Sequence, residues 1–552
     1  MRTRKPRVFE RPAPKSMPER ETADSAETDA VAERAERNYI YHNFTNSLCP
    51  TCLKVIQAKV IIQRGKVYLL KTCPEHGQMR TLLSSDAEYY LSQAQYNKPG
   101  TLPRHFQRRV EQGCPLDCGL CTDHEQHTCL ALVEITEACN LRCPTCFADS
   151  DVGRMIPLEE VERMLDVVVE NEGYADVVQI SGGEPTIHPQ LFEILAMAKK
   201  KRIRALMLNT NGVRIARDES FVRDLAAFNG NFEVYLQFDG FRESTYQDIR
   251  GLDLRAVKEQ AVANLTKYGI PINLTATVKR GVNDDELGAI VQYGIEQPMV
   301  RGVTFQPITN VGRHDDFDPL DRVTVPDVIA AIAEQTGGMF RKSDFVPLPC
   351  HSDCISMTYA YVKGKKVKPL PRYIDVKKYL DVIGNQITFK VEDMKDIVGA
   401  ALGRLWSASM PLSTPAALRD FACCLPVAPA ALDQTQHGSV LYENMFRIVI
   451  IAFMDAWNFD VRSAKKCCVH NILPDGSIIP FCAYNTLHRP KYMSKTRVLT
   501  SQAGRGTAED AEDAEAGRDG RHGVTENAEN AENAEARGGR GEGEAENAKA
   551  AK

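Results

Sequence analysis

The chain has 552 residues, 43% of them hydrophobic and 26% charged, which is enough material for roughly two to four folded domains. Its formal net charge is −5, and residues 501–552 hold 13 Asp and Glu against 7 Lys and Arg, so the rest of the chain is close to neutral. This balance excludes the overall basic excess that is typical of nucleic-acid-binding proteins, and we expect no nucleic acid among the partners.

Both ends of the chain are predicted to be disordered. Residues 1–37 are rich in Arg, Pro, Glu and Ala and contain no apolar run with a cleavage site of small residues, so no secretory signal is expected. Residues 493–552 repeat short units of Ala, Glu, Asp and Asn and read as a low-complexity tail. We therefore expect a cytoplasmic location, with peripheral contact at the inner membrane surface left open.

The most apolar interior run covers residues 446–459 (FRIVIIAFMDAWNF). Arg447 and Asp455 interrupt this run, and it is too short to cross a bilayer. We predict a buried helix there and no membrane-spanning segment.

The 17 cysteines stand in tight groups, and a reducing cytoplasm favours metal binding over disulfides. The first group lies in a module of residues 38–105, where CPTC (Cys49 and Cys52) and CPEHG (Cys73 and His76) flank a strand-like stretch. Two such knuckles resemble a zinc ribbon or a rubredoxin, in which four soft ligands enclose one tetrahedral ion. We predict a mononuclear zinc or iron site, and unliganded thiols near turns are the alternative.

The second group occupies residues 106–130, where four cysteines fall within 16 residues around Pro115 and Gly119. Such a segment can wrap around a cubane cluster with one thiolate on each iron, and zinc is the competing ion. We predict an auxiliary 4Fe-4S cluster whose ligands are Cys114, Cys118, Cys121 and Cys129.

The third group stops at three cysteines, Cys139, Cys143 and Cys146. It follows the strand-like run LALVEIT and precedes a predicted helix that begins near Pro157. The cysteines therefore lie in a loop at the carboxyl end of a strand, where α/β barrels place their chemistry. Three thiolates on a four-iron cluster leave one iron open for a small-molecule ligand, unless a distant fourth cysteine closes it.

This C-x-x-x-C-x-x-C loop, followed by the aromatic Phe147, resembles the radical S-adenosylmethionine superfamily. The next strand (DVVQISGGEP) ends in the turn that, in this family, receives the methionine amino group of the cofactor: Gly182, Gly183, Glu184 and Pro185. The resemblance implies an α/β fold with a partial (β/α)6 barrel over residues 131–340. It further implies that S-adenosylmethionine completes the coordination of the open iron and that Phe147 and the turn contact this cofactor.

Later apolar strands of the predicted barrel end in polar residues, which would point into its mouth. RALMLNTNG ends near Asn209, and VYLQFDG ends at Gln237 and Asp239. By analogy with the family, we assign these three residues to binding of S-adenosylmethionine, with Gln237 and Asp239 on the ribose. Ordinary turn residues at strand ends are the alternative.

Residues 341–492 form a predicted C-terminal auxiliary-cluster domain. Two separated motifs, PCHSDC and KKCCVHNILPDGSIIPFCAYN, carry its cysteines: Cys350, Cys354, Cys467, Cys468 and Cys482. We predict that four of them converge on a second auxiliary 4Fe-4S cluster, with Cys467 and Cys468 as alternatives for one ligand; core thiols are the competing interpretation. Cys423 and Cys424 have no partner motif and are expected to be core residues.

From about residue 40 to about residue 490, the chain resembles the archaeal tetraether lipid synthases and their bacterial relatives, some of which are described as pterin methyltransferases. The two knuckles, the CPLDCGLC segment and the closing PDGSIIPFCAYN carry this resemblance. It implies an enzyme that reductively cleaves S-adenosylmethionine to a 5′-deoxyadenosyl radical, abstracts hydrogen from an unactivated C–H bond and couples lipid alkyl chains. Methylation of a reduced pterin is the first alternative, and a multi-cluster electron-transfer protein is the second.

The implied cofactors are S-adenosylmethionine, up to three 4Fe-4S clusters and one mononuclear zinc or iron. The implied partners are a small-molecule or lipid substrate and a reduced flavodoxin or ferredoxin as electron donor. A lipid-coupling enzyme needs a long apolar tunnel, whereas a pterin enzyme needs a short polar pocket. The sequence does not choose between them.

Overall fold

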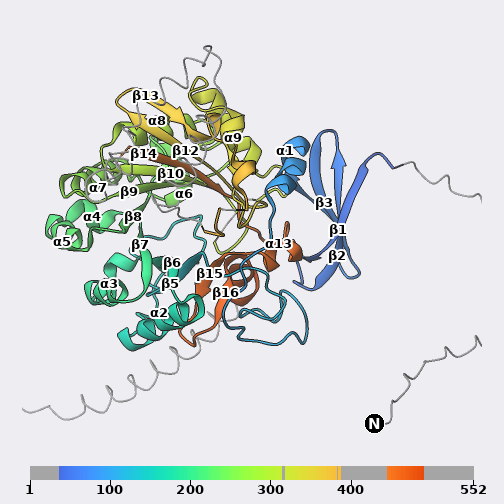
Figure 1. The fold of residues 1–552 in the computed structure, drawn as a ribbon, viewed down its shortest axis with the longest axis horizontal. Coiled ribbons are helices and arrows are strands. Elements are labelled where there is room, and N and C mark those ends of the chain that lie inside the picture. Colours follow the sequence, from blue (N-terminus) through green and yellow to red (C-terminus); the bar gives the residue numbers. More distant parts are fainter. Residues whose placement is uncertain (1–36, 314–316, 382, 387–443, 490–552) are drawn as a thin grey trace, which may run out of the picture. The chain divides into compact units, whose positions relative to one another are not determined.

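The computed structural model describes residues 37–313, 317–381, 383–386 and 444–489. The predictions for the two chain ends, and for Cys423 and Cys424, lie outside these residues. The described residues up to Arg489 belong to one compact unit (Figure 1). None of the helices in this part of the chain is long and apolar enough to cross a membrane.

The N-terminal module is an antiparallel sheet in the order β1-β2-β3-β4, whose strands are Ile40–Leu48, Val55–Gln63, Lys66–Cys73 and Gly77–Ser84. The stretch predicted as one strand-like unit is a hairpin of β2 and β3. Its turn residues, Arg64 and Gly65, have φ values of 52° and 72°, which suit a two-residue type I′ turn. Helix α1 (Ala87–Ser92) and a 3-10 turn (Gln93–Tyr96) follow.

Buried Lys71 ties this module to the C-terminal part of the chain. Its ammonium donates to the backbone oxygens of Leu48 at 2.5 Å, Ala456 at 2.7 Å and Trp457 at 2.9 Å. Nearby, the Thr45 hydroxyl donates to the Asp460 carboxylate at 2.5 Å. The module is therefore held by hydrogen bonds to residues 456–460 as well as by its link along the chain.

Six parallel strands follow in chain order, each beside the next: β5 (Leu130–Glu134), β6 (Ala175–Ser181), β7 (Ile203–Thr210), β8 (Phe232–Gln237), β9 (Ile272–Val278) and β10 (Val300–Pro307). Every residue of β6 is buried, as expected for a parallel strand covered on both faces. This arrangement confirms the predicted α/β fold with a partial (β/α)6 barrel.

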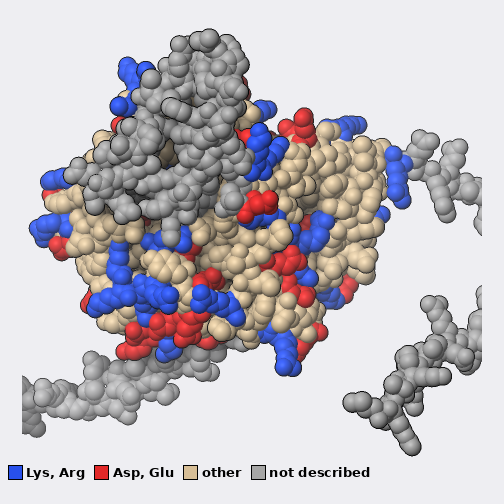
Figure 2. All heavy atoms as spheres, viewed as in Figure 1, with Lys and Arg blue, Asp and Glu red and all other residues tan. Residues whose placement is uncertain are grey.

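The helices that connect the strands line their outer side in Figure 1. They are α2 (Leu158–Glu172), α3 (Leu191–Lys200), α4 (Val213–Arg217), α5 (Glu219–Leu225), α6 (Glu243–Arg250), α7 (Arg255–Lys267), α8 (Leu287–Glu296) and α9 (Val325–Gln335). Helix α2 begins directly after Pro157, as predicted, and buries Met164 and Val168 against the sheet. Figure 2 shows basic and acidic side chains interspersed on the visible described surface, in keeping with the near-neutral balance.

The sheet continues beyond the barrel strands at both edges. Strand β14 (Met445–Ile451) pairs in parallel with β10 and antiparallel with β12 (Ile355–Lys363), while β15 (Val469–Ile472) pairs in parallel with β5. The remaining elements are β11 (Val346–Pro347), β13 (Lys366–Pro369), α13 (Val461–Lys465), β16 (Ile478–Pro480) and α14 (Phe481–Ala483). The sheet thus extends across the domain boundary that we predicted at residue 340.

The prediction of a buried helix at residues 446–459 is wrong. Residues 446–451 of the run belong to β14, which lies between β10 and β12, and residues 452–459 are a loop with turns. A short apolar run without clear periodicity suits a buried strand as well as a buried helix, and here neighbours on both sides decide in favour of the strand.

Candidate active site and metal-binding groups

The N-terminal metal group is complete within the sheet of β1 to β4. The ligand atoms of Cys49, Cys52, Cys73 and His76 all lie within 4.8 Å of one another. The Cys52 and Cys73 sulfurs are 3.9 Å apart, and His76 Nδ1 is 3.6 Å from Cys49 Sγ and 3.5 Å from Cys73 Sγ. Ligands at about 2.0–2.3 Å from one tetrahedral ion have this spacing, so the group fits a single zinc or iron ion.

A hydrogen bond with His76 lowers the pKa of the Cys73 thiol to about 6. The thiolate, which is the form that binds metal, is thereby favoured at neutral pH. The donor set and its protonation both suit the predicted mononuclear site.

The loop that carries Cys139, Cys143 and Cys146 runs from the end of β5 to α2, at the carboxyl edge of the sheet. The backbone N–H of Leu141 donates to Cys139 Sγ, and that of Ser150 donates to Cys146 Sγ, both at 3.4 Å. Within the described residues, these three sulfurs do not all lie within 4.8 Å of one another, whereas the N-terminal ligand atoms do. The wider spacing suits a multi-iron cluster better than a single ion.

Burial, assisted by the nearby Glu184, raises the pKa of Cys139 to about 12. A thiol in this setting needs a cationic partner to become a thiolate at neutral pH. An iron–sulfur cluster supplies such a partner, so these residues fit the group that the sequence predicts.

Arg313, in the loop after β10, holds the radical-cysteine loop from one side. Its guanidinium donates to the backbone oxygens of Cys143 and Ser150, both at 2.8 Å, and to the Asp149 carboxylate at 3.1 Å. Its backbone N–H donates to the oxygen of Cys146 at 2.8 Å. Nothing in the sequence pattern marked this arginine.

The predicted glycine turn packs directly on the residues that lead into Cys139. Backbone N–H groups of Gly183 and Glu184 donate to the oxygens of Thr136 and Ala138 at 2.8 and 2.9 Å. A Cβ on Gly182 would lie 2.3 Å from Thr136 O, and one on Gly183 would lie 2.1 Å from Ala138 O. Both positions therefore require glycine, because any side chain would push this backbone away. Pro185 opens the short 3-10 turn that follows.

The Glu184 carboxylate is buried and accepts four hydrogen bonds within the protein. It accepts from the N–H and hydroxyl of Thr186 at 3.0 and 2.6 Å, from the Thr210 hydroxyl at 2.7 Å and from the Asn211 N–H at 2.7 Å. A carboxylate has about four acceptor sites, and the residue is 0% exposed. Its side chain therefore fixes the turn against β7, and the contact of this residue with the cofactor stays a prediction.

Polar side chains at the strand ends form a row across β6, β7 and β8. Asn209 donates to the Ser181 hydroxyl at 3.1 Å and accepts from Gln237 at 3.0 Å. Gln237 in turn accepts from Arg250 at 2.9 Å. The half-buried Asn209 and Gln237 thus lie side by side at the mouth, where their assignment to cofactor binding stays a prediction.

Asp239, which we assigned to the ribose from the sequence, is engaged within the protein. It is 0% exposed, and its two carboxylate oxygens accept from Arg250 Nε at 2.6 Å and Nη2 at 2.8 Å. The Thr277 N–H adds a third bond at 3.0 Å. A buried carboxylate engaged in this way anchors Arg250, and its assignment to ribose binding stays a prediction.

Phe147 belongs to an aromatic cluster, which we define as Phe147, Phe453 and Phe481. The ring of Phe147 stacks on Phe481 at a centroid distance of 5.1 Å, and Phe453 lies 5.5 Å from Phe147 and 4.7 Å from Phe481. The cluster joins the radical-cysteine loop to the segment that ends in Cys482. Contact of Phe147 with the cofactor stays a prediction.

The auxiliary cysteines are grouped differently from the prediction. Cys129, Cys350 and Cys468 bring their sulfurs within 4.8 Å of one another, and those of Cys350 and Cys468 are 3.6 Å apart. Cys129 precedes β5 and Cys468 precedes β15, and the parallel pairing of these strands sets them side by side, with Cys129 N–H donating to Cys468 O at 2.8 Å. Contacts with the Cys129 and Cys468 thiols lower the pKa of Cys350 to about 5, which favours a thiolate for metal binding.

The other cysteines divide between two apolar clusters. Cys114 and Cys118 pack in the same cluster as Cys482, whereas Cys354 and Cys467 pack with the group of Cys129. The structure therefore places Cys482 with the CPLDCGLC segment, to which Cys121 also belongs, instead of with Cys350. Of the two alternatives Cys467 and Cys468, it is Cys468 that joins the ligand group.

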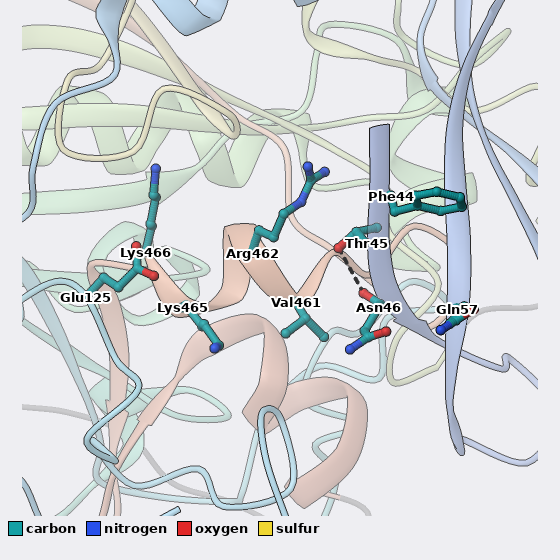
Figure 3. Close-up of a pocket in the computed structure, with 9 residues that line it drawn as sticks. All are labelled: Phe44, Thr45, Asn46, Gln57, Glu125, Val461, Arg462, Lys465 and Lys466. Atoms are coloured by element: carbon teal, nitrogen blue, oxygen red, sulfur yellow. Dashed lines mark hydrogen bonds between the residues drawn. The ribbon is translucent and has the colours of Figure 1, made fainter. Parts of the chain in front are cut away.

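A cavity of about 750 Å³ lies between β1, β2 and α13 (Figure 3). Its walls are Phe44, Thr45, Asn46, Gln57, Glu125, Val461, Arg462, Lys465 and Lys466. Figure 3 shows the strands of the N-terminal module on one side and the basic residues of the α13 segment on the other. None of the predicted cofactor or metal ligands lines it.

The comparisons with known proteins agree with this geometry. Residues 133–294 match the Radical SAM superfamily, and residues 41–85 match the HMPTM N-terminal zinc ribbon domain. The 7,8-dihydro-6-hydroxymethylpterin dimethyltransferase of Methanocaldococcus jannaschii is 34% identical over 483 residues, which cover 82% of this chain and 95% of that protein. The chain belongs to the radical SAM superfamily, in the family of this archaeal protein. The zinc-ribbon match confirms the predicted N-terminal module.

More distant relatives match smaller parts of the chain. The GTP 3′,8-cyclase of Alkaliphilus metalliredigens is 28% identical over 184 residues, which cover 32% of this chain and 56% of that protein. Streptococcus suis SuiB bound to the precursor peptide SuiA aligns with a TM-score of 0.31 and 17% identity, over 36% of this chain and 44% of that one. A radical SAM methyltransferase from Sphaerobacter thermophilus aligns with a TM-score of 0.29 and 10% identity, over 54% of this chain and 74% of that one.

Proposed function

We propose that this radical SAM enzyme transfers a methyl group to a carbon of a reduced pterin. The observation that supports this proposal is the 34% identity to the pterin dimethyltransferase along 95% of its length. That match covers 82% of this chain, against 32% for the cyclase of Alkaliphilus metalliredigens, and the zinc-ribbon match covers residues 41–85.

The residues of the barrel mouth have distinct tasks in this proposal. When bound, the cluster and S-adenosylmethionine supply an electron and a 5′-deoxyadenosyl radical that removes hydrogen from a C–H bond. Cys139, Cys143 and Cys146 hold the cluster, and the glycine turn fixes the backbone that presents them. The row of Ser181, Asn209 and Gln237 offers hydrogen-bonding groups that orient a polar ligand at the strand ends.

Coupling of lipid alkyl chains is the second candidate function. It is favoured by the aromatic cluster, because Phe147 follows the last radical cysteine and its ring contacts two further apolar rings. An aromatic surface next to the radical site suits an alkyl chain, which gains little from the polar row.

One experiment separates the two candidates. Anaerobically reconstituted full-length protein is given a reductant, S-adenosylmethionine labelled on its methyl group, and either a reduced hydroxymethylpterin or lipid deuterated on its terminal methyl groups. We expect the pterin to gain one or two methyl groups while 5′-deoxyadenosine accumulates. If the pterin is unchanged and deuterium from the lipid appears in 5′-deoxyadenosine, lipid coupling replaces the pterin proposal.

A further inference from the structure

The inner face of the barrel sheet is polar at β6. Val178 and Ile180 belong to the core cluster that also holds the buried residues of α2 and α3. The alternating residues Gln179 and Ser181 therefore face the opposite, inner side of the sheet. Ser181 accepts from Asn209 in the row at the mouth. Gln179 lies two residues before Ser181 on the same strand, so it faces the barrel interior beneath that row.

The amide of Gln179 is buried and unpaired. The residue is only 5% exposed, and its side chain makes no hydrogen bond to any residue that the structure describes. Asn209 and Gln237, by contrast, are hydrogen-bonded to each other. A buried amide without partners is unfavourable unless a polar molecule from outside the chain satisfies it. Gln179 therefore marks a position on the inner face that suits a polar ligand.

A second amide with an unpaired group lies in the same row of the sheet. Leu132 of β5 is in register with Gln179 on one side and with Asn471 of β15 on the other, so all three side chains face inward. Asn471 is 1% exposed, and its Nδ2 donates to the Glu134 carboxylate at 3.2 Å, which fixes the direction of the amide. Its Oδ1 accepts no hydrogen bond from the described part of the chain. Two amides thus flank one apolar residue across three neighbouring strands, with their backbones about 10 Å apart.

We propose that Gln179 and Asn471 recognise the ring of the pterin, with Gln179 on its lactam edge. The pyrimidinone ring of a pterin carries an N–H beside a carbonyl. A primary amide pairs with this edge by accepting from the N–H and donating to the carbonyl oxygen. A flat ring that lies over Leu132 also brings another of its N–H groups to Asn471 Oδ1.

The composition of this row agrees with a ring and not with an alkyl chain. An apolar floor with a few fixed polar groups is typical of small-molecule sites. An alkyl chain would leave both amides unpaired and buried, which opposes its binding. The inference rests on the proposed function and adds to it the residues that determine specificity.

The test measures binding of 7,8-dihydro-6-hydroxymethylpterin to the anaerobically reconstituted full-length protein by calorimetric titration, with S-adenosylmethionine present and no reductant. Gln179→Met keeps the length of the side chain but removes both hydrogen-bonding groups. We therefore expect the dissociation constant to rise roughly 10- to 100-fold. Gln247→Met, at an exposed position of α6, is the matched control and should bind as tightly as the wild type.

An analogue provides a second route that needs no substitution. A methyl group on ring N3 removes the lactam N–H, so the wild type should bind the N3-methyl pterin roughly tenfold or more weakly than the parent compound. Gln179→Met should bind the two pterins within about threefold of each other, because it no longer reads this edge.

The outcomes separate this inference from the proposed function. Equal binding of the parent pterin by the wild type and Gln179→Met would overturn the inference and leave the proposed function standing. Equal binding of the two pterins by the wild type would do the same. If the wild type binds neither pterin, the proposed function fails, and the inference fails with it.

Discussion

The zinc-ribbon group and the radical-cysteine loop use cysteine in opposite ways. In the ribbon, four ligand atoms from two neighbouring turns close around one position, with all separations within 4.8 Å and three of them between 3.5 and 3.9 Å. In the loop, three sulfurs are spread, and elements from across the barrel contact the backbone around them. The ribbon therefore suits a structural ion, and the loop suits a cluster with one position left for a ligand.

The difference also concerns what surrounds each group. The ribbon ligands depend on their own two hairpins, whereas the loop is supported by the glycine turn after β6, by the backbone of Ile249 in α6 and by Arg313 after β10. Changes in the ribbon should thus affect stability, while changes around the loop should affect chemistry.

The largest effect is expected from removing the radical cysteines. Replacing Cys139, Cys143 and Cys146 together by Ala removes the ligands of the open cluster, so formation of 5′-deoxyadenosine should fall to the level of a control without enzyme. The ribbon ion should stay bound, because none of its ligands is changed. Product analysis and metal analysis of the same sample test both parts, and surviving cleavage would contradict the assignment.

A second prediction concerns the regrouped auxiliary cysteines. Cys129→Ala should remove the same metal as Cys468→Ala, about four irons per chain if that centre is a 4Fe-4S cluster. The double variant should lose no more than either single variant, because the two sulfurs belong to one group. If Cys129→Ala instead removes the same metal as Cys121→Ala, and its metal loss adds to that of Cys468→Ala, the grouping predicted from the sequence is right.

A third prediction isolates the ribbon. Cys49→Ser should release one metal ion per chain and lower the thermal midpoint, because the four-ligand site is broken. Cleavage of S-adenosylmethionine per radical cluster should stay within about twofold of the wild type, since the two groups share no ligand. A loss of cleavage comparable to that of the triple cysteine variant would show that the two regions are not separable.

A fourth prediction concerns the lysine that docks the ribbon. Lys71→Met removes the donor to three backbone oxygens, and leaving these acceptors unpaired should cost about 2–4 kcal/mol of unfolding free energy. Lys66→Met, an exposed position at the start of the same strand, is the matched control and should change little. Equal shifts of the thermal midpoint in the two variants would contradict this role.

The smallest effect is a pH dependence at the same site. Burial lowers the pKa of Lys71 from 10.5 to about 8. Between these values the unfolded chain binds more protons than the folded one, so the contribution of Lys71 to stability rises with pH in this window. The thermal midpoint of the wild type minus that of Lys71→Met should therefore increase between about pH 8 and 10. A difference that stays constant over this range would contradict the lowered pKa of Lys71.

Local motifs were the predictable part of this molecule. The two knuckles, the radical-cysteine loop and the glycine turn each lie within a few residues. Their spacing in the sequence therefore predicts which side chains lie close together. The parallel strands were predictable because buried strands have apolar runs that end in polar residues.

Pairings over long sequence distances were not predictable. The partnership of Cys129 with Cys468 follows from the register of β5 and β15, which no local pattern contains. The same holds for β14, whose apolar sequence fits a helix until its neighbours are known. In the sequence, Asp239 is an acidic residue that follows a predicted strand. Only the packing of α6 shows that Arg250 donates two hydrogen bonds to its carboxylate.

The central claim is that the cluster of the radical-cysteine loop has one iron open to S-adenosylmethionine. Pulsed EPR of the reduced full-length protein, with S-adenosylmethionine carrying ¹⁵N in its amino group, tests this claim most directly. We expect a hyperfine coupling between the cluster and the labelled nitrogen, and its loss in the triple Cys139, Cys143 and Cys146 variant. A reduced cluster signal at this site that neither changes with S-adenosylmethionine nor couples to ¹⁵N would contradict the account.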